Sequence, residues 1–227
     1  MFQSVILAGG FGTRLKSVSG STPKPMMLVG NEPFLYKLMK KLESNGCNKI
    51  ILSLHYKAKE IINKVENDKP VKCKVEFAIE DVPLGTGGAI KNASKYITDK
   101  KFLVLNGDTY CEINYSEILK EVDSSVMIIL VTKVDDTSRY GRILLDKNFK
   151  VLKMSEKVKN TSKSGLINVG TYIIDKDAIR NYKDEIFSLE MDFIPINIDK
   201  IKAHIIETFF IDIGIPSDYF LACKKLQ

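Results

Sequence analysis

The sequence contains few of the residues that enzymes use most often for acid–base or nucleophilic chemistry. Only two of its 227 residues are histidines, His55 and His204, and neither stands in a glycine-rich or acidic cluster. No Ser/His/Asp or Cys/His arrangement is suggested, and no zinc site built from histidine and cysteine. Chemistry that depends on positioning and charge neutralisation, as phosphoryl-type transfer does, is compatible with this composition.

Cysteine is also scarce, and the spacing of the cysteines argues against further classes of protein. The four cysteines form no C-x-x-C pair, so they indicate neither a zinc pattern nor a dense disulfide framework. We interpret them as reduced, mostly buried thiols of a cytoplasmic protein. The first ten residues include no basic residue, unlike a signal peptide, and no apolar run approaches the roughly 18 residues of a membrane span. A membrane partner is therefore not expected.

The net charge of +6 comes from lysines spread along the whole chain. It fits either a lysine-rich soluble surface or a basic cleft for phosphate-bearing ligands. A nucleic-acid partner is not expected, because the sequence shows neither a basic stripe nor aromatic platforms. The apolar share of 44% and charged share of 27% are those of a globular protein. We expect one domain, residues 1–227.

The first half of the chain alternates apolar runs with segments of helical periodicity. Such alternation predicts βαβ units and a parallel sheet covered on both faces. The second half is richer in strands and predicts an extension of the same sheet. The expected fold class is thus α/β, with a Rossmann-like, mostly parallel mixed sheet and a small β-rich extension. Strands are expected at 4–8, 49–54, 75–79, 102–105, 126–131, 141–145, 151–155, 165–174 and 209–212, and helices at 33–44, 58–67 and 87–95.

The strongest motif lies directly after the first expected strand. Gly9, Gly10 and Gly12 let the backbone approach a ligand and point N–H groups at it. Arg14 adds a fork of donors for phosphate oxygens, and Lys24 adds a point charge between two prolines. Together they indicate a phosphate-binding loop.

Two better-known glycine motifs fail on spacing. A dinucleotide fingerprint that started at Gly10 would need glycine where Leu15 stands. A P-loop that started at Gly9 would need Gly-Lys where Arg14 and Leu15 stand. A dinucleotide-binding oxidoreductase is therefore disfavoured.

Two further segments follow expected strands, at the sheet edge where α/β proteins bind ligands. Residues 80–89 are glycine-rich and open a helix, whose N-terminus favours anions and polar ligand edges. Residues 105–109 place Asp108 on a tight turn, where it suits Mg²⁺. Asp212 ends another expected strand far along the chain, and the two aspartates could share one metal.

With these residues assembled, the sequence resembles the sugar nucleotidyltransferases over nearly its whole length. Residues 7–15 with 23–26 are similar to the family's defining motif, and 83–89, 106–108 and 210–219 to later blocks. Within the family the chain is most similar to guanylyltransferases that act on D-glycero-α-D-manno-heptose 1-phosphate, on the evidence of Leu84–Gly88 and Ser188–Glu190. The resemblance implies a nucleotide-binding half, 1–125, and a sugar-phosphate-binding half, 126–227, which includes the β-rich extension.

The resemblance also implies roles for individual residues, Mg²⁺ as cofactor, and GTP and a sugar 1-phosphate as substrates. Arg14 and Lys24 would be catalytic, and Asp108 and Asp212 would hold the metal. The nucleotide would be bound by Leu7, Gly9, Gly10, Gly12, Thr13, Glu80, Gly85, Thr86, Asn106 and Gly107. The sugar phosphate would be bound by Gly141, Glu156, Lys157, Asn168 and Gly170.

Several alternatives remain open at this point. UTP, dTTP or CTP with a hexose 1-phosphate could be the substrate pair. A non-catalytic paralogue that binds a nucleotide sugar and regulates a partner is a second possibility, against which Arg14, Lys24 and both aspartates argue. A homodimer is also possible, through apolar surface on the C-terminal strands.

Overall fold

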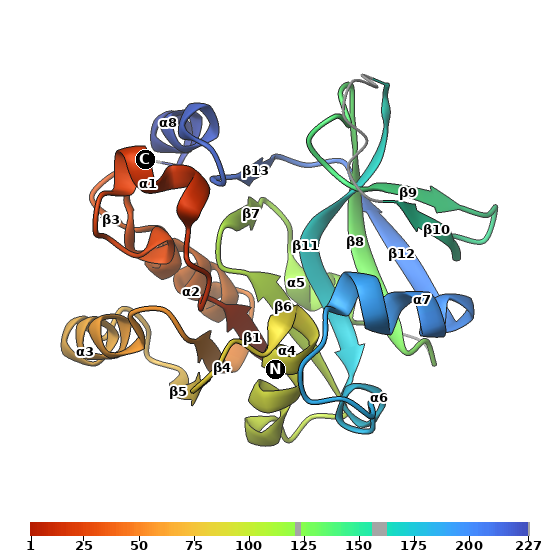
Figure 1. The fold of residues 1–227 in the computed structure, drawn as a ribbon, viewed down its shortest axis with the longest axis horizontal. Helices are drawn as coiled ribbons and strands as arrows, with labels where there is room; N and C mark the ends of the chain where they lie inside the picture. The colour runs from red at the N-terminus through yellow and green to blue at the C-terminus, as the bar shows by residue number, and fades with distance from the viewer. Residues whose placement is uncertain (121–123, 156–162, 227) are drawn as a thin grey trace.

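A nine-stranded mixed sheet with helices on both faces forms the body of the molecule (Figure 1). The computed structural model describes residues 1–120, 124–155 and 163–226, apart from the side chain at position 16. The strand order is β10-β9-β11-β6-β1-β4-β5, and β8 pairs with both β11 and β12. The α/β fold class predicted from the sequence is confirmed.

The first half of the chain supplies the parallel part of the sheet. Val5 and Ile6 are adjacent in β1, both fully buried, and belong to core clusters on opposite faces of the sheet. Strands covered on both faces read as continuous apolar runs for this reason. The parallel strands are β1 (Phe2–Leu7), β4 (Cys47–Leu54), β5 (Lys74–Ile79) and β6 (Lys101–Asn106), and the helices beside them are α2 (Phe34–Ser44), α3 (Ala58–Asp68) and α4 (Gly85–Ala93).

The second half continues the sheet with mostly antiparallel strands. The long strand β11 (Gly165–Asp175) pairs antiparallel with β6, β8 and β9, and so joins the two halves. At the far side β12 runs parallel to β8. These strands are β8 (Met127–Val134), β9 (Arg142–Leu145), β10 (Val151–Ser155) and β12 (Ile201–Ile206).

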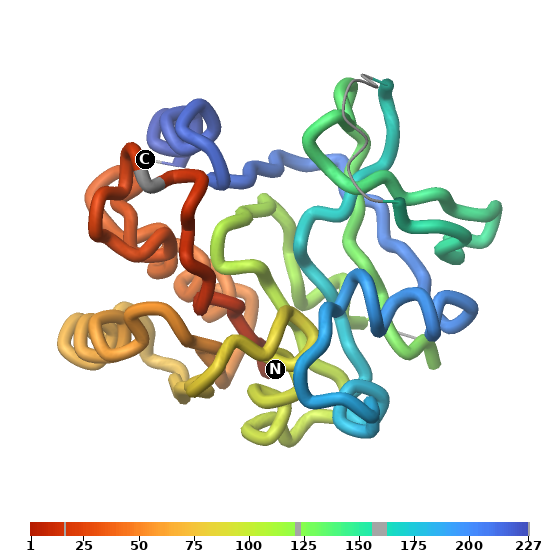
Figure 2. The backbone as a smooth tube through the Cα atoms, viewed as in Figure 1, coloured from red at the N-terminus to blue at the C-terminus, as the bar shows by residue number. Residues whose placement is uncertain are grey.

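The C-terminal segment of the chain packs beside the N-terminal segment. β13 (Phe210–Asp212) pairs with β7 (Thr109–Cys111), and α8 (Pro216–Lys225) follows. Figure 2 shows this blue segment lying beside the red N-terminal segment. There the hydroxyl of Tyr219 donates to the carbonyl of Leu28, at 2.7 Å. The remaining elements are β2 (Leu28–Val29), β3 (Glu32–Pro33), α1 (Lys16–Ser19), α5 (Tyr115–Lys120), α6 (Lys176–Arg180), α7 (Ile194–Asn197), a π-helix (Leu189–Phe193) and short 3-10 turns.

Most predicted strands and helices lie within two residues of the observed ones. The sequence analysis predicted the short strand β13 as residues 209–212. It missed β12, which contains His204, the ten-residue helix α8, and the short elements β2, β3, β7, α1, α5, α6 and α7. Two-residue strands such as β2 and β3 carry no periodicity, so only their pairing with each other defines them.

Candidate functional site

The glycine-rich loop after β1 is held against the end of β4. The amide of Ala8 donates to the carbonyl of Ser53 at 2.9 Å, and the amide of Tyr56 donates to the carbonyl of Gly9 at 3.2 Å. A 3-10 turn follows, in which Leu15 is fully buried. Burial of Leu15 leaves its neighbour Arg14 exposed at the cleft.

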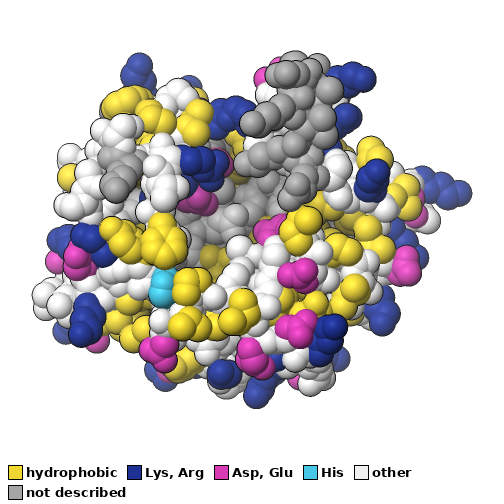
Figure 3. Space-filling model, in the orientation of Figure 1, with side chains coloured by type: hydrophobic (Ala, Val, Ile, Leu, Met, Phe, Trp, Pro, Cys, Tyr) yellow, Lys and Arg dark blue, Asp and Glu magenta, His cyan; other side chains and the backbone are white. Residues whose placement is uncertain are grey.

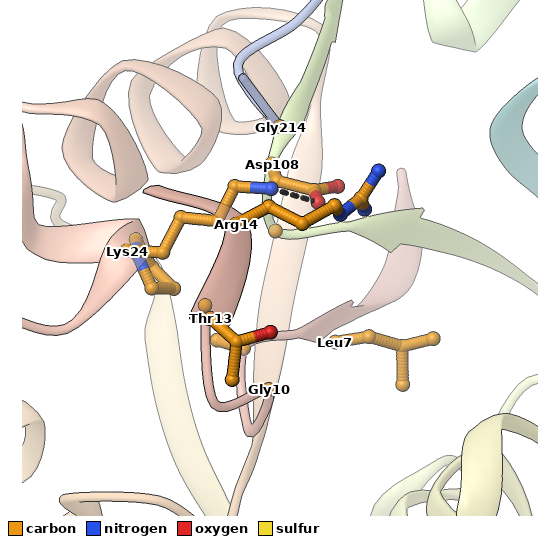
Figure 4. A pocket seen from close by; sticks show the side chains of 11 residues that line it. Leu7, Gly10, Thr13, Arg14, Lys24, Asp108 and Gly214 are labelled. Atoms are coloured by element: carbon orange, nitrogen blue, oxygen red, sulfur yellow. Dashed lines mark hydrogen bonds and ion pairs between the residues drawn. The ribbon is translucent and has the colours of Figure 1, made fainter. Parts of the chain in front are cut away.

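Lys24 and Asp108 meet beside this loop (Figure 4). The Lys24 ammonium donates to Oδ2 of Asp108 at 2.5 Å, although the residues are 84 positions apart. Figure 4 shows the side chain of Arg14 beside this pair. A cavity of about 160 Å³ opens here, lined by Leu7, Ala8, Gly10, Gly12, Thr13, Arg14, Lys24, Pro25, Gly107, Asp108 and Gly214.

The β7–β13 pair brings Asp108 and Asp212 together. Asp212 lies opposite Thr109 in this ladder, and the amide of Ile213 donates to the carbonyl of Asp108 at 2.9 Å. Burial, and next the charge of Asp108, raise the pKa of Asp212, while Lys24 and Arg14 lower it. Two carboxylates that repel each other at the edge of a phosphate-sized cavity are a suitable site for a divalent cation.

A second cavity, of about 320 Å³, lies between the ends of β1, β4 and β5. Glu80 is buried there, and its carboxylate accepts from the Ser53 hydroxyl and the Leu84 amide, each at 3.1 Å. These bonds hold the 80–84 loop in place at the start of α4. The cavity is lined by Leu7, Gly9, Gly10, Phe11, Ser53, His55, Glu80, Pro83, Gly85, Thr86, Ala89, Asn106 and Asp108.

A third cavity, of about 550 Å³, lies on the side of the second half. Asn168 Oδ1 accepts from the Gly170 amide at 2.8 Å, and its Nδ2 donates to the Tyr172 hydroxyl at 2.7 Å. Both bonds anchor the Asn168 side chain within β11. The cavity is lined by Arg14, Asn106, Asp108, Thr109, Tyr140, Gly141, Met154, Ser155, Asn168, Val169, Gly170, Tyr172, Ser188, Glu190, Met191, Pro195, Phe210 and Asp212.

The three cavities are parts of one cleft. Asp108 lines all three of them, and Arg14 lines the first and the third. Figure 3 shows the hollow, with basic and acidic side chains side by side on its left wall. A molecule that filled the first and second cavities would meet one in the third at Asp108.

All predicted site residues but two line this cleft. The exceptions, Glu156 and Lys157, lie outside the described residues. The sequence analysis missed Phe11, Ser53 and His55, although Ser53 and His55 stand at the end of a predicted strand, where such residues are expected. It also left Tyr172 and Glu190 out of the site, because their place depends on long-range packing.

Neither a ready-made metal-binding cluster nor a membrane-spanning helix is found in the described part of the chain. Its residues include no group of three or more His, Cys, Asp or Glu side chains that could hold a metal alone. A metal there would need ligands from substrate as well as from the two aspartates. None of the helices described has the length and apolar character needed to cross a membrane.

Comparison with known proteins shows the family of the chain. A D-glycero-alpha-D-manno-heptose 1-phosphate guanylyltransferase of Campylobacter jejuni is 38% identical over 221 residues, which cover 96% of this chain and 97% of that protein. One of the same name from Aneurinibacillus thermoaerophilus is 34% identical and covers 99% of this chain and 98% of its own. The crystal structure of HddC from Yersinia pseudotuberculosis, also solved in complex with GMP-PN, is 51% identical, with a TM-score of 0.92 over all of both chains. The model of the nucleotidyl transferase family matches residues 3–227, and the chain belongs to that family.

Proposed function

We propose that this enzyme transfers GMP from GTP to D-glycero-α-D-manno-heptose 1-phosphate, releasing pyrophosphate and giving a GDP-heptose. The main support is the meeting of three cavities at Asp108, because a nucleoside, a triphosphate and a sugar phosphate each need a place. The choice of GTP and heptose rests on the names of the two relatives that are similar over their whole lengths.

In this proposal the nucleotide occupies the first two cavities. Backbone of Gly9, Gly10 and Gly12 faces the phosphates, together with Thr13. The base lies against the 80–86 loop, and Leu7, Asn106 and Gly107 form the floor. Glu80, Gly85 and Thr86 are the proposed contacts to the base. The Glu80 carboxylate accepts one hydrogen bond at each oxygen, so it still has acceptor sites for N–H groups of the base.

The sugar 1-phosphate occupies the third cavity, with Gly141, Asn168 and Gly170 on its walls and Glu156 and Lys157 as further proposed contacts. Its phosphate oxygen attacks the α-phosphorus of GTP in line. A bond from that oxygen to the α-phosphorus forms while the bond to the pyrophosphate oxygen breaks. The nucleophile is already an anion near neutral pH, so no protein base is required. Arg14 and Lys24 stabilise the charge on the transferring and leaving phosphates.

Mg²⁺ is the proposed cofactor, and the donor set fits it. Asp108 and Asp212 offer carboxylate oxygens at one point, and magnesium prefers one or two carboxylates plus substrate phosphates. A bound Mg²⁺ would neutralise phosphate charge and polarise the phosphoryl group. The Lys24 ammonium has three donors, so it can hold Asp108 and still donate to a phosphate.

The division into a nucleotide half, 1–125, and a sugar-phosphate half, 126–227, is part of the same proposal, as are a cytoplasmic location and a homodimer. Exposed apolar side chains on β9 and β10, such as Leu144 and Leu152, support the homodimer. Sedimentation velocity tests it, and a monomer at micromolar concentration would contradict it.

The test of the reaction is pyrophosphate release with Mg²⁺, crossing GTP, ATP, CTP, UTP and dTTP with heptose, mannose and glucose 1-phosphates. Release confined to GTP and the heptose phosphate is expected. Release with another pair keeps the reaction and replaces the substrates. No release from any pair, with measurable binding of a nucleotide sugar, favours the regulatory paralogue. The Asp212→Asn variant should lose release, whereas Asp199→Asn, which changes an acid outside the cleft, should retain it.

A further inference from the structure

Glu190 is held in the third cavity by three hydroxyl groups from different parts of the chain. The Thr86 and Ser188 hydroxyls donate to its Oε2 at 2.7 and 3.3 Å, and the Tyr172 hydroxyl donates to its Oε1 at 3.1 Å. Tyr172 is fully buried, so one of these donors is itself rigid. The carboxylate therefore has a defined position in the cleft.

The turn that carries Glu190 is equally well anchored. Leu189 is fully buried, and its amide donates to the Thr86 hydroxyl at 2.9 Å. The Ser188 hydroxyl accepts from the Met191 amide at 3.1 Å and so caps the π-helix. The carbonyl of Phe187 accepts from the amides of Gly87 and Gly88 in α4. Residues 187–190 thus form a strap across the start of α4.

Counting lone pairs shows that this carboxylate has acceptor capacity left. Each carboxylate oxygen can accept two hydrogen bonds. Both sites of Oε2 are occupied by hydroxyl groups, whereas Oε1 receives only Tyr172. Within the described residues, moreover, no Lys or Arg forms an ion pair with Glu190. A partly buried anion without a cation gains from any hydroxyl donor that enters the cavity.

We propose that Glu190 is a specificity-determining residue, whose Oε1 accepts a hydrogen bond from a hydroxyl group of the sugar. This inference rests on the proposed function, because it needs a sugar in the third cavity. Glu190 lines the same cavity as Asp108 and Asp212. A sugar 1-phosphate whose phosphate lies at Asp108 would therefore present its hydroxyl groups to Glu190. Sugars that lack this hydroxyl, or present it in the other configuration, leave the Oε1 site unfilled and bind less well.

The test compares E190Q with E185Q in steady-state kinetics. Glu185 is an exposed acid just before the strap and pairs with Lys91 outside the cleft, so it is a matched control. E190Q should raise KM for the sugar 1-phosphate by about 10- to 100-fold, the range of a hydrogen bond to a charged group. KM for GTP should change less than about 3-fold, and E185Q should behave as the wild type.

A purely structural role gives a different result, because Glu190 bonds Thr86 beside the nucleotide. Equal losses for GTP and sugar phosphate, together with a lower Tm, would overturn the proposal. Substrates offer a test that needs no variant. Among sugar 1-phosphates that each lack one hydroxyl, at least one should have a kcat/KM with the wild type about 10-fold below that of the complete sugar 1-phosphate. With E190Q, removing the same hydroxyl should lower kcat/KM little further. If the effects on kcat/KM of the missing hydroxyl and of E190Q were instead additive in free energy, the proposal would also be overturned.

Calorimetry separates failure of this inference from failure of the proposed function. If the wild type releases no pyrophosphate, binding of GDP-mannose can still be compared with binding of GDP. Tighter binding of GDP-mannose that E190Q abolishes would support a sugar contact at Glu190 in a non-catalytic protein. Equal affinities for the two ligands in wild type and E190Q would overturn the contact.

Discussion

Arg14 and Lys24 lie in one cavity but differ in what they already bond. The side chain of Lys24 is 10% exposed and paired with Asp108. Arg14 is exposed, and its guanidinium forms no ion pair with the residues described here. Its charge is therefore available to a ligand, and the fold does not depend on it.

We predict that Arg14→Ala lowers kcat by about 10²- to 10³-fold, the usual cost of one donor to a developing anion. Tm should stay within about 2 °C of the wild-type value, because no ion pair within the protein is lost. Pyrophosphate release and thermal unfolding measure the two effects. Arg180→Ala, which removes an exposed arginine of α6, is the control. Near-normal turnover in Arg14→Ala would remove Arg14 from the mechanism.

At the scale of elements, the start of α4 is the most constrained part of the site. Gly85 has a φ of 74°, and a Cβ there would lie 2.5 Å from the carbonyl oxygen of Phe187. The close approach lets the 187–190 strap bond the first turn of α4. A side chain at Gly85 would therefore push the strap, and Glu190 with it, away from the nucleotide loop.

We predict that Gly85→Ala costs more stability than a positive φ alone explains. Gly20 has a φ of 56°, and a Cβ at that position would have no other atom within 4 Å, so Gly20→Ala measures the backbone cost by itself. That cost is about 1 kcal/mol. Gly85→Ala should cost roughly 1–3 kcal/mol more in urea unfolding and should weaken GTP binding. Equal costs would show that the strap moves freely.

For the whole molecule, burial of thiols links stability to alkaline pH. Burial raises the pKa of the Cys111 thiol to about 12, and that of Cys73 likewise to about 12. The unfolded chain loses these protons near pH 8.5, whereas the folded chain keeps them. Stability is therefore complete below that pH and falls as the pH rises toward 12, by up to about 1.4 kcal/mol per pH unit for each thiol.

We predict that Cys111→Ala reduces this pH dependence. The free energy of unfolding, measured in urea between pH 8 and pH 10.5, should fall less steeply in the variant than in the wild type. The absolute stability of the variant does not enter the comparison, because only the slope is read. A slope that matches the wild type would mean that Cys111 ionises as readily in the folded protein as in the unfolded one.

The sequence by itself determined the fold class and the local part of the site. Gly9, Gly12, Arg14 and Lys24 belong to one short motif, and Asp108 lies on the turn just after a strand that its apolar run reveals. Contiguous patterns of this kind depend on backbone geometry over a few residues, which the order of amino acids specifies directly.

Only the tertiary structure decided which distant residues meet. The bond from Lys24 to Asp108, the pairing of Asp212 with Thr109 and the three hydroxyls around Glu190 join segments that no periodicity connects. The pairing of Asp212 depends on a three-residue strand pair, and the place of Tyr172 depends on the register of β11 in the main sheet. Register is set by the burial of whole faces, so it emerges only when the complete sheet is assembled.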